Sequence, residues 1–306
     1  MFYYGFVRWA ADAYMTLASV SLRWALPVLA AVLPTACAQD FVPAHPWRLV
    51  WSDEFDGPAN AAPDLTKWTY DLGQTGWGNA ELENYTSSIS NAFQDGSGHL
   101  VIQAVASAGG GYASARLKTQ GLATFSYGKI EARIRIPFGQ GIWPTFWMMG
   151  ADITAVGWPH CGEIDIMENR GKEPATIHGT VHGPGYSAAK GIGAPYKLPA
   201  GQRFADEFHL FTVLRDQESV EFQVDGHTYK RVTPADLPAG APWVFDHPFF
   251  LLLNVAVGGK WPGYPDATTH FPQRMVVDYV RVYSRWRLIA LGQIGSRRQS
   301  VATLLN

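Results

Sequence analysis

Three carboxylate side chains, Glu163, Asp165 and Glu168, fall within six residues of this sequence. On an extended strand Glu163 and Asp165 point to the same face, because side chains alternate between the two faces. Glu168 lies at an odd offset from Glu163 and would face the other way, unless a β-bulge absorbs one extra residue, for which Met167 is the candidate. The four remaining strand steps place the two glutamate Cα atoms about 13 Å apart. Long side chains that lean together can then bring the carboxyl groups to the roughly 5–5.5 Å needed for retaining glycoside hydrolysis.

The residues between these acids leave three interpretations open. Ile164, Ile166 and Met167 indicate that one face of the strand is buried and that the acidic face is not. No Lys or Arg separates the acids, so their charges repel, which is more typical of a catalytic or metal site than of a plain surface. Spacing alone favours catalysis and keeps a metal site and a solvated acidic face as alternatives. In the catalytic interpretation Asp165 hydrogen-bonds a neighbour and helps to keep the pKa values of the two glutamates apart.

Four nearby nitrogen and sulfur donors raise the separate question of zinc: His160, Cys161, His178 and His182. The Gly-Thr-Val segment between His178 and His182 is typical of a strand. On a strand an offset of four residues separates the two histidines by roughly 13 Å, which is too far for one zinc ion. The sequence therefore argues against a zinc site.

The segments around these residues read as short strands with Gly, Pro, Asn and Asp turns between them. From Gly128 to Ile136 the alternation is regular, with apolar residues at 130, 132, 134 and 136 and charged residues at 129, 131, 133 and 135. Other expected strands cover residues 100–105, 219–224, 249–254 and 275–283, and long amphipathic helices are absent. We therefore predict an all-β fold, a jelly-roll sandwich of two antiparallel sheets.

Composition limits the partners of the chain. Of its 306 residues 47% are hydrophobic and 16% are charged, and the formal net charge is −2. This balance gives no polycationic face, so nucleic acid is not an expected partner. A large aromatic core explains most of the 12 Trp, 13 Tyr and 16 Phe, although some Trp rings could line a sugar groove and stack on the C–H faces of pyranosides.

The N-terminal residues carry the features of an export signal. Arg23 precedes an apolar run over residues 24–33, and Ala36-Cys37-Ala38 follows, which predicts a signal peptide over residues 1–38. The run is too short for a membrane span. We expect a secreted protein, extracellular or periplasmic. Lipoprotein anchoring through Cys37 is the less favoured alternative, because Pro34 stands where a lipobox has Leu, Val or Ile.

The remainder of the chain divides at residue 284. Residues 39–284 are predicted to form one catalytic domain, and residues 285–306 form a tail to which we assign no structure or function. Removal of the signal peptide would leave Cys161 without a disulfide partner.

The acid cluster resembles the signature of glycoside hydrolase family 16, in the bulged form of its laminarinase-like branch. Further stretches resemble the family in the same order along the chain, from Trp51 to Tyr283. These motifs are Trp51–Gly57, Trp77–Tyr85, Ser114–Thr119, Tyr127–Arg133, Gly141–Trp147, Gly162–Glu168, Gly179–Tyr186, Asn254–Gly259 and Val277–Tyr283.

The resemblance implies a concave-faced sandwich whose cleft holds a glucan chain. It implies Glu163 as the nucleophile, Glu168 as the general acid/base and Asp165 as their assistant. The family's substrate-binding positions correspond to Asn79, Arg116, Trp143, Trp147, Trp158, His182 and Trp261. For Trp143, packing in the core is the alternative.

The resemblance also bears on metal ions. It implies that catalysis needs no cofactor, and it suggests a structural Ca²⁺ on the convex face, held by Glu54, Gly98 and Asp278. One departure from the family is Leu214-Arg215, where relatives often carry a Trp, and we interpret this position as structural.

The activity implied is that of a secreted, monomeric endo-β-1,3-glucanase acting on β-glucan with retention. In this family the bulged signature accompanies mainly laminarin-type substrates. The alternatives are another family 16 hydrolase, acting on mixed-linkage β-glucan or a marine galactan, and a non-catalytic β-glucan-binding protein. The last is the least favoured, because such proteins have lost the two glutamates that this chain retains.

Overall fold

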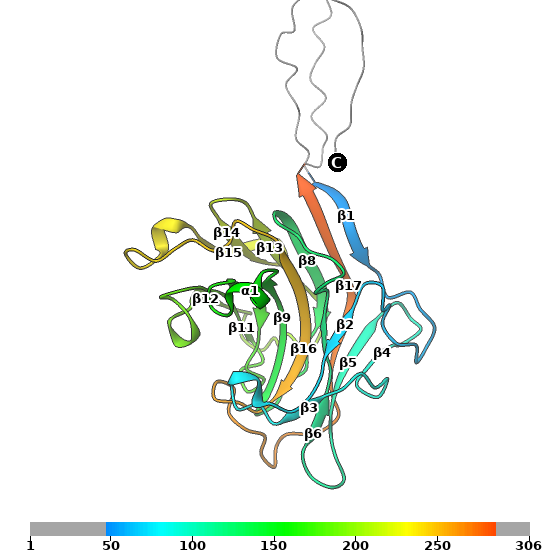
Figure 1. The fold of residues 1–306 in the computed structure, drawn as a ribbon. Coiled ribbons are helices and arrows are strands. Elements are labelled where there is room, and N and C mark those ends of the chain that lie inside the picture. Colours follow the sequence, from blue (N-terminus) through cyan, green and yellow to red (C-terminus); the bar gives the residue numbers. More distant parts are fainter. Residues whose placement is uncertain (1–46, 286–306) are drawn as a thin grey trace, which may run out of the picture. The chain divides into compact units, whose positions relative to one another are not determined.

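The structure, a computed structural model, describes residues 47–285, whose regular secondary structure is almost entirely β-strand (Figure 1). The predicted signal peptide, Cys37 and the tail beyond Arg285 lie outside the described residues. The strands are β1 (Trp47–Asp53), β2 (Thr69–Asp71), β3 (Glu83–Tyr85), β4 (Ala92–Gln94), β5 (Leu100–Ala106), β6 (Tyr112–Ser114), β7 (Arg116–Lys118), β8 (Gly128–Arg135), β9 (Ile142–Gly150), β10 (Glu163–Glu168), β11 (Thr176–His182), β12 (Ile192–Lys197), β13 (His209–Arg215), β14 (Val220–Val224), β15 (His227–Val232), β16 (Phe249–Val257) and β17 (Gln273–Arg285).

Helical structure is scarce in this part of the chain. The one α-helix among residues 47–285 is α1 (Ile153–Val156), and three 3₁₀ turns cover Gly76–Gly78, Ala188–Lys190 and Pro234–Asp236. No helix in this range has the length and apolar character needed to cross a bilayer.

The strands of this range form two sheets. The seven-stranded sheet has the order β12-β11-β10-β9-β16-β7-β2, and the ten-stranded sheet follows β15-β14-β13-β8-β17-β5-β6-β3, with β1 paired to β17 and β4 to β5. All pairings are antiparallel except that of β3 with β6. The two sheets pack face to face, because β10 contacts β13 and β16 contacts β5 across the core. The predicted antiparallel sandwich is therefore confirmed.

Alternation along the strands builds the core between the sheets. On β8, Ile130, Ala132 and Ile134 are fully buried, as the period-two pattern predicted. Phe146 and Met148 of β9 meet them from the other sheet in the same apolar cluster. Because neighbouring residues on each strand point away from this core, the seven-stranded sheet has a second face, which we call the site face.

Arg215 at the end of β13 is a buried cation without a carboxylate partner. Its Nε and Nη2 donate to the carbonyl oxygen of Phe245 at 3.1 and 2.7 Å, Nη1 donates to that of Phe125 at 3.0 Å, and Nη2 also donates to that of His247. The guanidinium lies 4.1 Å from the centre of the Phe249 ring. Arg215 therefore ties two loops to the end of the ten-stranded sheet, which supports the structural interpretation of this position.

Replacing Arg215 with Met should destabilise the protein without touching the site face. The carbonyls of residues 245 and 247 would lose their Arg215 donors, whereas that of Phe125 also accepts from the backbone N–H of Phe249. We expect a loss of about 3 kcal/mol, since each buried unsatisfied group costs roughly 1–3 kcal/mol. Thermal unfolding would report this as a fall in Tm of roughly 10 °C. Arg203→Met, at an exposed ion pair with Asp206, is the control and should change Tm little. Equal Tm values for the two variants would contradict the stabilising role of the hydrogen bonds that Arg215 donates.

Candidate active site

Strand β10 carries the three acids and contains a β-bulge. Against β11, Asp165 pairs with Thr180 and Glu168 with His178, so two residues of β10 lie opposite one of β11. Against β9, Glu163 pairs with Met149 and Glu168 with Thr145. Measured on the regular strand β9, the two glutamates are therefore four positions apart, an even number, and they share the site face.

The identity of the extra residue differs from the prediction. On β9, Met167 pairs with Phe146, and Ile166 is the residue that the register skips. Both side chains are buried in the core. The residue opposite them on β11 is Gly179, where a Cβ atom would lie 2.3 Å from the Tyr229 hydroxyl. A residue without a side chain at this position thus leaves space for the rings of Tyr229 and Phe222.

The cross-strand pairs define the rows of the site face. One row runs from β2 to β11 through Asp71, Arg116, Asn254, Thr145, Glu168 and His178, and the next runs through Thr69, Lys118, Leu252, Trp147, Asp165 and Thr180. The sequence-predicted residues Arg116, Trp147, Asp165, Glu168 and His182 therefore come together on one sheet face although they span five strands.

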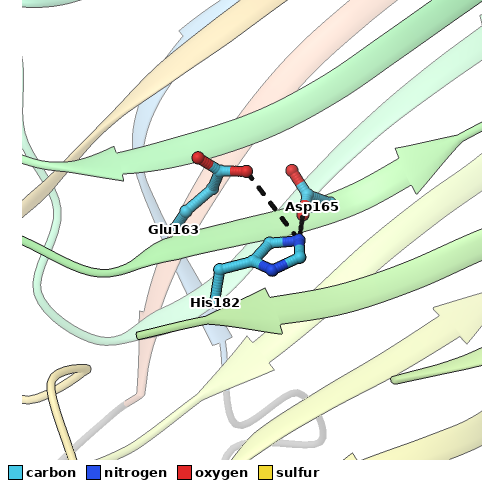
Figure 2. A group of neighbouring side chains, drawn as sticks. All are labelled: Glu163, Asp165 and His182. Atoms are coloured by element: carbon cyan, nitrogen blue, oxygen red, sulfur yellow. Dashed lines mark ion pairs between the residues drawn. The ribbon is translucent and has the colours of Figure 1, made fainter. Parts of the chain in front are cut away.

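His182 contacts two of the acids (Figure 2). Its Nε2 lies 3.1 Å from Oδ2 of Asp165 and 3.9 Å from Oε1 of Glu163. The ring packs so closely on Gly191 that a Cβ atom there would lie 2.3 Å from its Cε1. His182, which was predicted as a substrate-binding residue, thus lies beside Asp165 and Glu163. The acidic face is also more enclosed than expected, since Asp165 is only 4% exposed.

Burial and mutual repulsion shift the acids in the same direction but unequally. Burial raises the pKa of Glu163 to about 8, the Asp165 charge adds to this, and His182 and Arg116 act against it. Burial likewise raises the pKa of Asp165 to about 8. For Glu168, burial and then the Asp165 charge raise the pKa well above the ordinary value, and Glu163 raises it further. All three acids therefore favour their protonated forms, and at Glu163 the Arg116 charge opposes this.

Glu168 is held by an aromatic cluster. The indole Nε1 of Trp143 donates to Oε1 of Glu168 at 3.1 Å. Trp261 packs on Trp143 with ring centres 5.4 Å apart, and on His178 at 5.2 Å. Trp143 and Trp261 therefore form the wall beside the acid/base candidate.

Arg116 and the other polar predictions lie further along the site face. The Arg116 guanidinium lies between two rings, 4.8 Å from the centre of Trp77 and 4.7 Å from that of Trp147. Its Nε is 2.9 Å from Oδ2 of Asp71. Asn79 donates from Nδ2 to Oε1 of Glu81 at 3.0 Å.

A hollow of about 280 Å³ adjoins Arg116 and Trp77. It is lined by Met149, Phe250 and Leu252 from β9 and β16. An apolar floor with charged groups at its border can hold a ring-shaped, hydroxyl-rich ligand.

Trp158 lies at the opposite end of the acid group. It is 45% exposed, and a hydrogen bond from its side chain helps to lower the pKa of Glu163. An exposed indole beside a catalytic candidate fits the predicted rim position.

Several residues of this face were not predicted as site residues. Glu81, Glu83 and Tyr85 are buried beneath it, and their alternation in the motif Glu-Leu-Glu-Asn-Tyr was the available signal. Asp71 and Asn254 carried no such signal, because only the cross-strand register brings them to Arg116 and Trp147.

The residues predicted to hold calcium do not form a cation site. Both oxygens of Glu54 accept from Arg281, at 3.0 and 2.7 Å, and Oδ2 of Asp278 accepts from Arg133 at 2.6 Å. Gly98 can offer only its backbone carbonyl. Since Ca²⁺ needs six to eight oxygen ligands and both carboxylates are already neutralised by guanidinium groups, the arrangement does not fit the ion.

The zinc alternative also lacks a suitable donor set. His178 and His182 face Glu168 and Glu163 respectively, four positions apart on β11. Cys161 is a buried free thiol, and burial raises its pKa to about 11, which disfavours the thiolate that binds zinc. The one group of three candidate ligands found in residues 47–285 is Glu163, Asp165 and His182, the same residues that the carboxylate chemistry uses.

Two glutamates on one face of a sheet, a buried aspartate between them and aromatic rings beside them define a glycoside hydrolase. The comparison with known families agrees. Residues 80–281 match the Glycosyl hydrolases family 16, and the chain belongs to this family.

Known relatives share most of the chain. The Beta-glucanase of Rhodothermus marinus is 42% identical over 254 residues, which cover 78% of this chain and 86% of that protein. The laminarinase catalytic domain of Thermotoga maritima MSB8 superposes with a TM-score of 0.74 and 49% identity, covering 79% of this chain and 100% of that one. The endo-beta-1,3-glucanase of Pyrococcus furiosus gives a TM-score of 0.73 and 50% identity, with 78% and 95% coverage.

Proposed function

We propose that this enzyme is an endo-β-1,3-glucanase that cleaves laminarin-type glucan by a retaining double displacement. The observation that carries the proposal is the bulge in β10, which brings Glu163 and Glu168 to the same face. The names of the relatives supply the substrate: they are described as a β-glucanase, a laminarinase and an endo-β-1,3-glucanase, and they align over nearly the whole described region.

In the first step Glu163 attacks the anomeric carbon as its carboxylate. The bond from this carbon to the glycosidic oxygen breaks, and Glu168 transfers its proton to that oxygen, so the leaving chain departs as an alcohol. The Arg116 charge supports these roles, because it favours the carboxylate form of Glu163, whereas burial and the charges of Asp165 and Glu163 favour the protonated form of Glu168.

In the second step Glu168, now a carboxylate, removes a proton from water. The hydroxyl attacks the anomeric carbon, the ester bond to Glu163 breaks, and both acids return to their starting states. Two inversions give net retention. Asp165 and His182 touch Glu163 and orient it, while Trp143 orients Glu168 through its indole N–H.

The proposal is tested by product analysis on laminarin, lichenan, curdlan and agarose. We expect short β-1,3-oligosaccharides from laminarin and, by proton NMR within the first minutes, the β-anomer before mutarotation. Early α-anomer would exclude the double displacement. Cleavage of agarose alone would favour the galactan alternative, and laminarin binding without release of reducing ends would favour the binding protein.

Export and a monomeric state complete the proposal. Export rests on the signal-like residues 1–38, and its measurement is the N-terminal sequence of protein recovered from the medium or periplasm, expected to begin at Gln39. We also propose that the protein is a monomer. Sedimentation giving the mass of a dimer would contradict it.

A further inference from the structure

Two buried glutamates lie beneath the site face, outside the catalytic group. Glu83, the first residue of β3, is fully buried, and Glu81, two residues before it, is 8% exposed. None of the ion pairs in residues 47–285 involves either of them. Burying two carboxyl groups without a cation costs free energy of folding. A functional role for Glu81 and Glu83 would explain this cost.

Glu81 holds two side chains by hydrogen bonds. Its Oε1 accepts from Nδ2 of Asn79 at 3.0 Å, and its Oε2 accepts from the Tyr85 hydroxyl at 3.3 Å. The Tyr85 hydroxyl in turn accepts from Nδ2 of Asn254 at 3.0 Å.

Asn254 carries the network to the site face. Its Oδ1 accepts from Nε1 of Trp147 at 2.9 Å and from Oγ1 of Thr145 at 2.7 Å. On β9 these two residues are the cross-strand partners of Asp165 and Glu168. The chain of hydrogen bonds therefore begins at Glu81 and ends directly beside the catalytic strand.

Glu83 anchors the same segment to the end of β16. Its Oε2 accepts from the backbone N–H of Val257 at 2.6 Å, while its buried Oε1 accepts no hydrogen bond. Burial, and then the neighbouring Glu81, raise the pKa of Glu83 to about 8. A neutral Glu83 can donate its proton toward Glu81, which leaves one negative charge on the pair.

We propose that the Glu81–Glu83 pair is a positioning element for the glucan, acting through Asn79 on one side and through Tyr85, Asn254 and Trp147 on the other. Neither carboxyl group touches the reacting atoms. The pair instead fixes which way the Asn79 amide and the Trp147 indole face. This inference rests on the proposed function, which supplies the glucan as the substrate.

The first test replaces Glu81 with Gln and measures kcat and KM on laminarin. An amide cannot accept at both of its ends, so the proton of Tyr85 or the amide of Asn79 loses its acceptor. We expect KM to rise about tenfold, equivalent to about 1.4 kcal/mol of binding, with kcat within threefold of the wild type. Glu131→Gln is the matched control: Glu131 is a buried glutamate on β8, away from the site face, and accepts a hydrogen bond from Lys129, and its loss should leave KM unchanged.

The second test compares Gln and Leu at position 83. Gln can accept from Val257 and donate to Glu81, so Glu83→Gln should rescue the increase in KM that Glu83→Leu causes. Between pH 6 and 9 the wild-type KM should rise more steeply than that of Glu83→Gln, because Glu83 loses its proton only in the wild type, whereas Glu163 and Asp165, whose pKa values burial raises to about 8, titrate in both proteins. The other titratable or charged side chains around Glu83 are Glu81, Tyr85, Arg116 and its cross-strand partner Tyr112, and all of them are present in both proteins.

The outcomes separate the inference from the proposed function. A wild type inactive on laminarin would defeat the function. An active wild type with an unchanged KM in Glu81→Gln would overturn the inference, as would a Glu83→Gln variant that shows the same alkaline rise in KM. A fall in Tm without a change in KM would reduce the pair to a structural role and also overturn it.

Discussion

Glu163→Gln should lower kcat on laminarin by at least about 10⁴-fold, because an amide cannot form the covalent ester intermediate and the first step is then lost rather than slowed. The substitution is nearly isosteric, so the contacts of His182 and Trp158 can remain and KM should change little. Activity within tenfold of the wild type would remove Glu163 from the role of nucleophile. Glu131→Gln serves again as the control for loss of a buried carboxylate away from the site.

The same variant should be more stable than the wild type at alkaline pH. Burial raises the pKa of Glu163 to about 8, whereas in the unfolded chain it is near 4.3. Between these values the folded state binds more protons than the unfolded one, so the free energy of unfolding falls as pH rises through this window. Glu163→Gln removes this dependence. We expect equal Tm values at pH 4 and a higher Tm for the variant at pH 8, measured by calorimetry without substrate.

This pairing of effects distinguishes a catalytic acid from a structural one. A glutamate kept for stability would lower Tm when replaced, whereas one kept for chemistry is held in an unfavourable site and raises Tm on replacement. A Glu163→Gln variant that is inactive and also less stable at pH 8 would show that the loss of activity arises from damage to the fold.

Sequence reasoning predicted the elements in which local pattern and tertiary environment agree. The alternation in β8 correctly predicted that Ile130, Ala132 and Ile134 are buried, because one side of that strand faces the core and the other does not. The acid cluster pointed to Glu163, Asp165 and Glu168 because three carboxylates without cations between them are more typical of a catalytic or metal site than of a plain surface strand. In both cases the information lies within a few consecutive residues.

The remaining features depend on partners that are distant in sequence. The extra residue of the bulge is decided by the register on β9, which pairs Met167 with Phe146. Asp165 is enclosed because His182 from β11 packs against it. Asp278 and Glu54, the two carboxylates predicted to hold calcium, are paired with arginines from β8 and β17. Spacing along one strand contains no information about these neighbours.

Removal of the β-bulge in β10 is the second change for which we expect a large effect on activity. Deletion of Ile166 leaves Glu-Ile-Asp-Met-Glu, which keeps the pairs of Asp165 with Trp147 and of Met167 with Phe146 and restores a regular ladder against β11. The fold should survive, because all three acids remain on the site face. Losing one buried side chain should cost about 2–4 kcal/mol. Deletion of Met167 should cost more, since it moves Ile166 into the place that Met167 fills opposite Phe146.

The matched control is Ile166→Ala, which removes the same core side chain and keeps the bulge. Both variants should lose similar stability, but only the deletion straightens the strand and re-aims Glu168 relative to Glu163. Because a displacement of about 1 Å at a catalytic group can cost roughly 10²-fold in rate, we expect kcat/KM on laminarin to fall about 100-fold in the deletion and less on mixed-linkage glucan, with Ile166→Ala near the wild type. Equal activity of the two variants on laminarin would mean that the bulge only accommodates an extra core residue. The bulge would then no longer support laminarin as the proposed substrate.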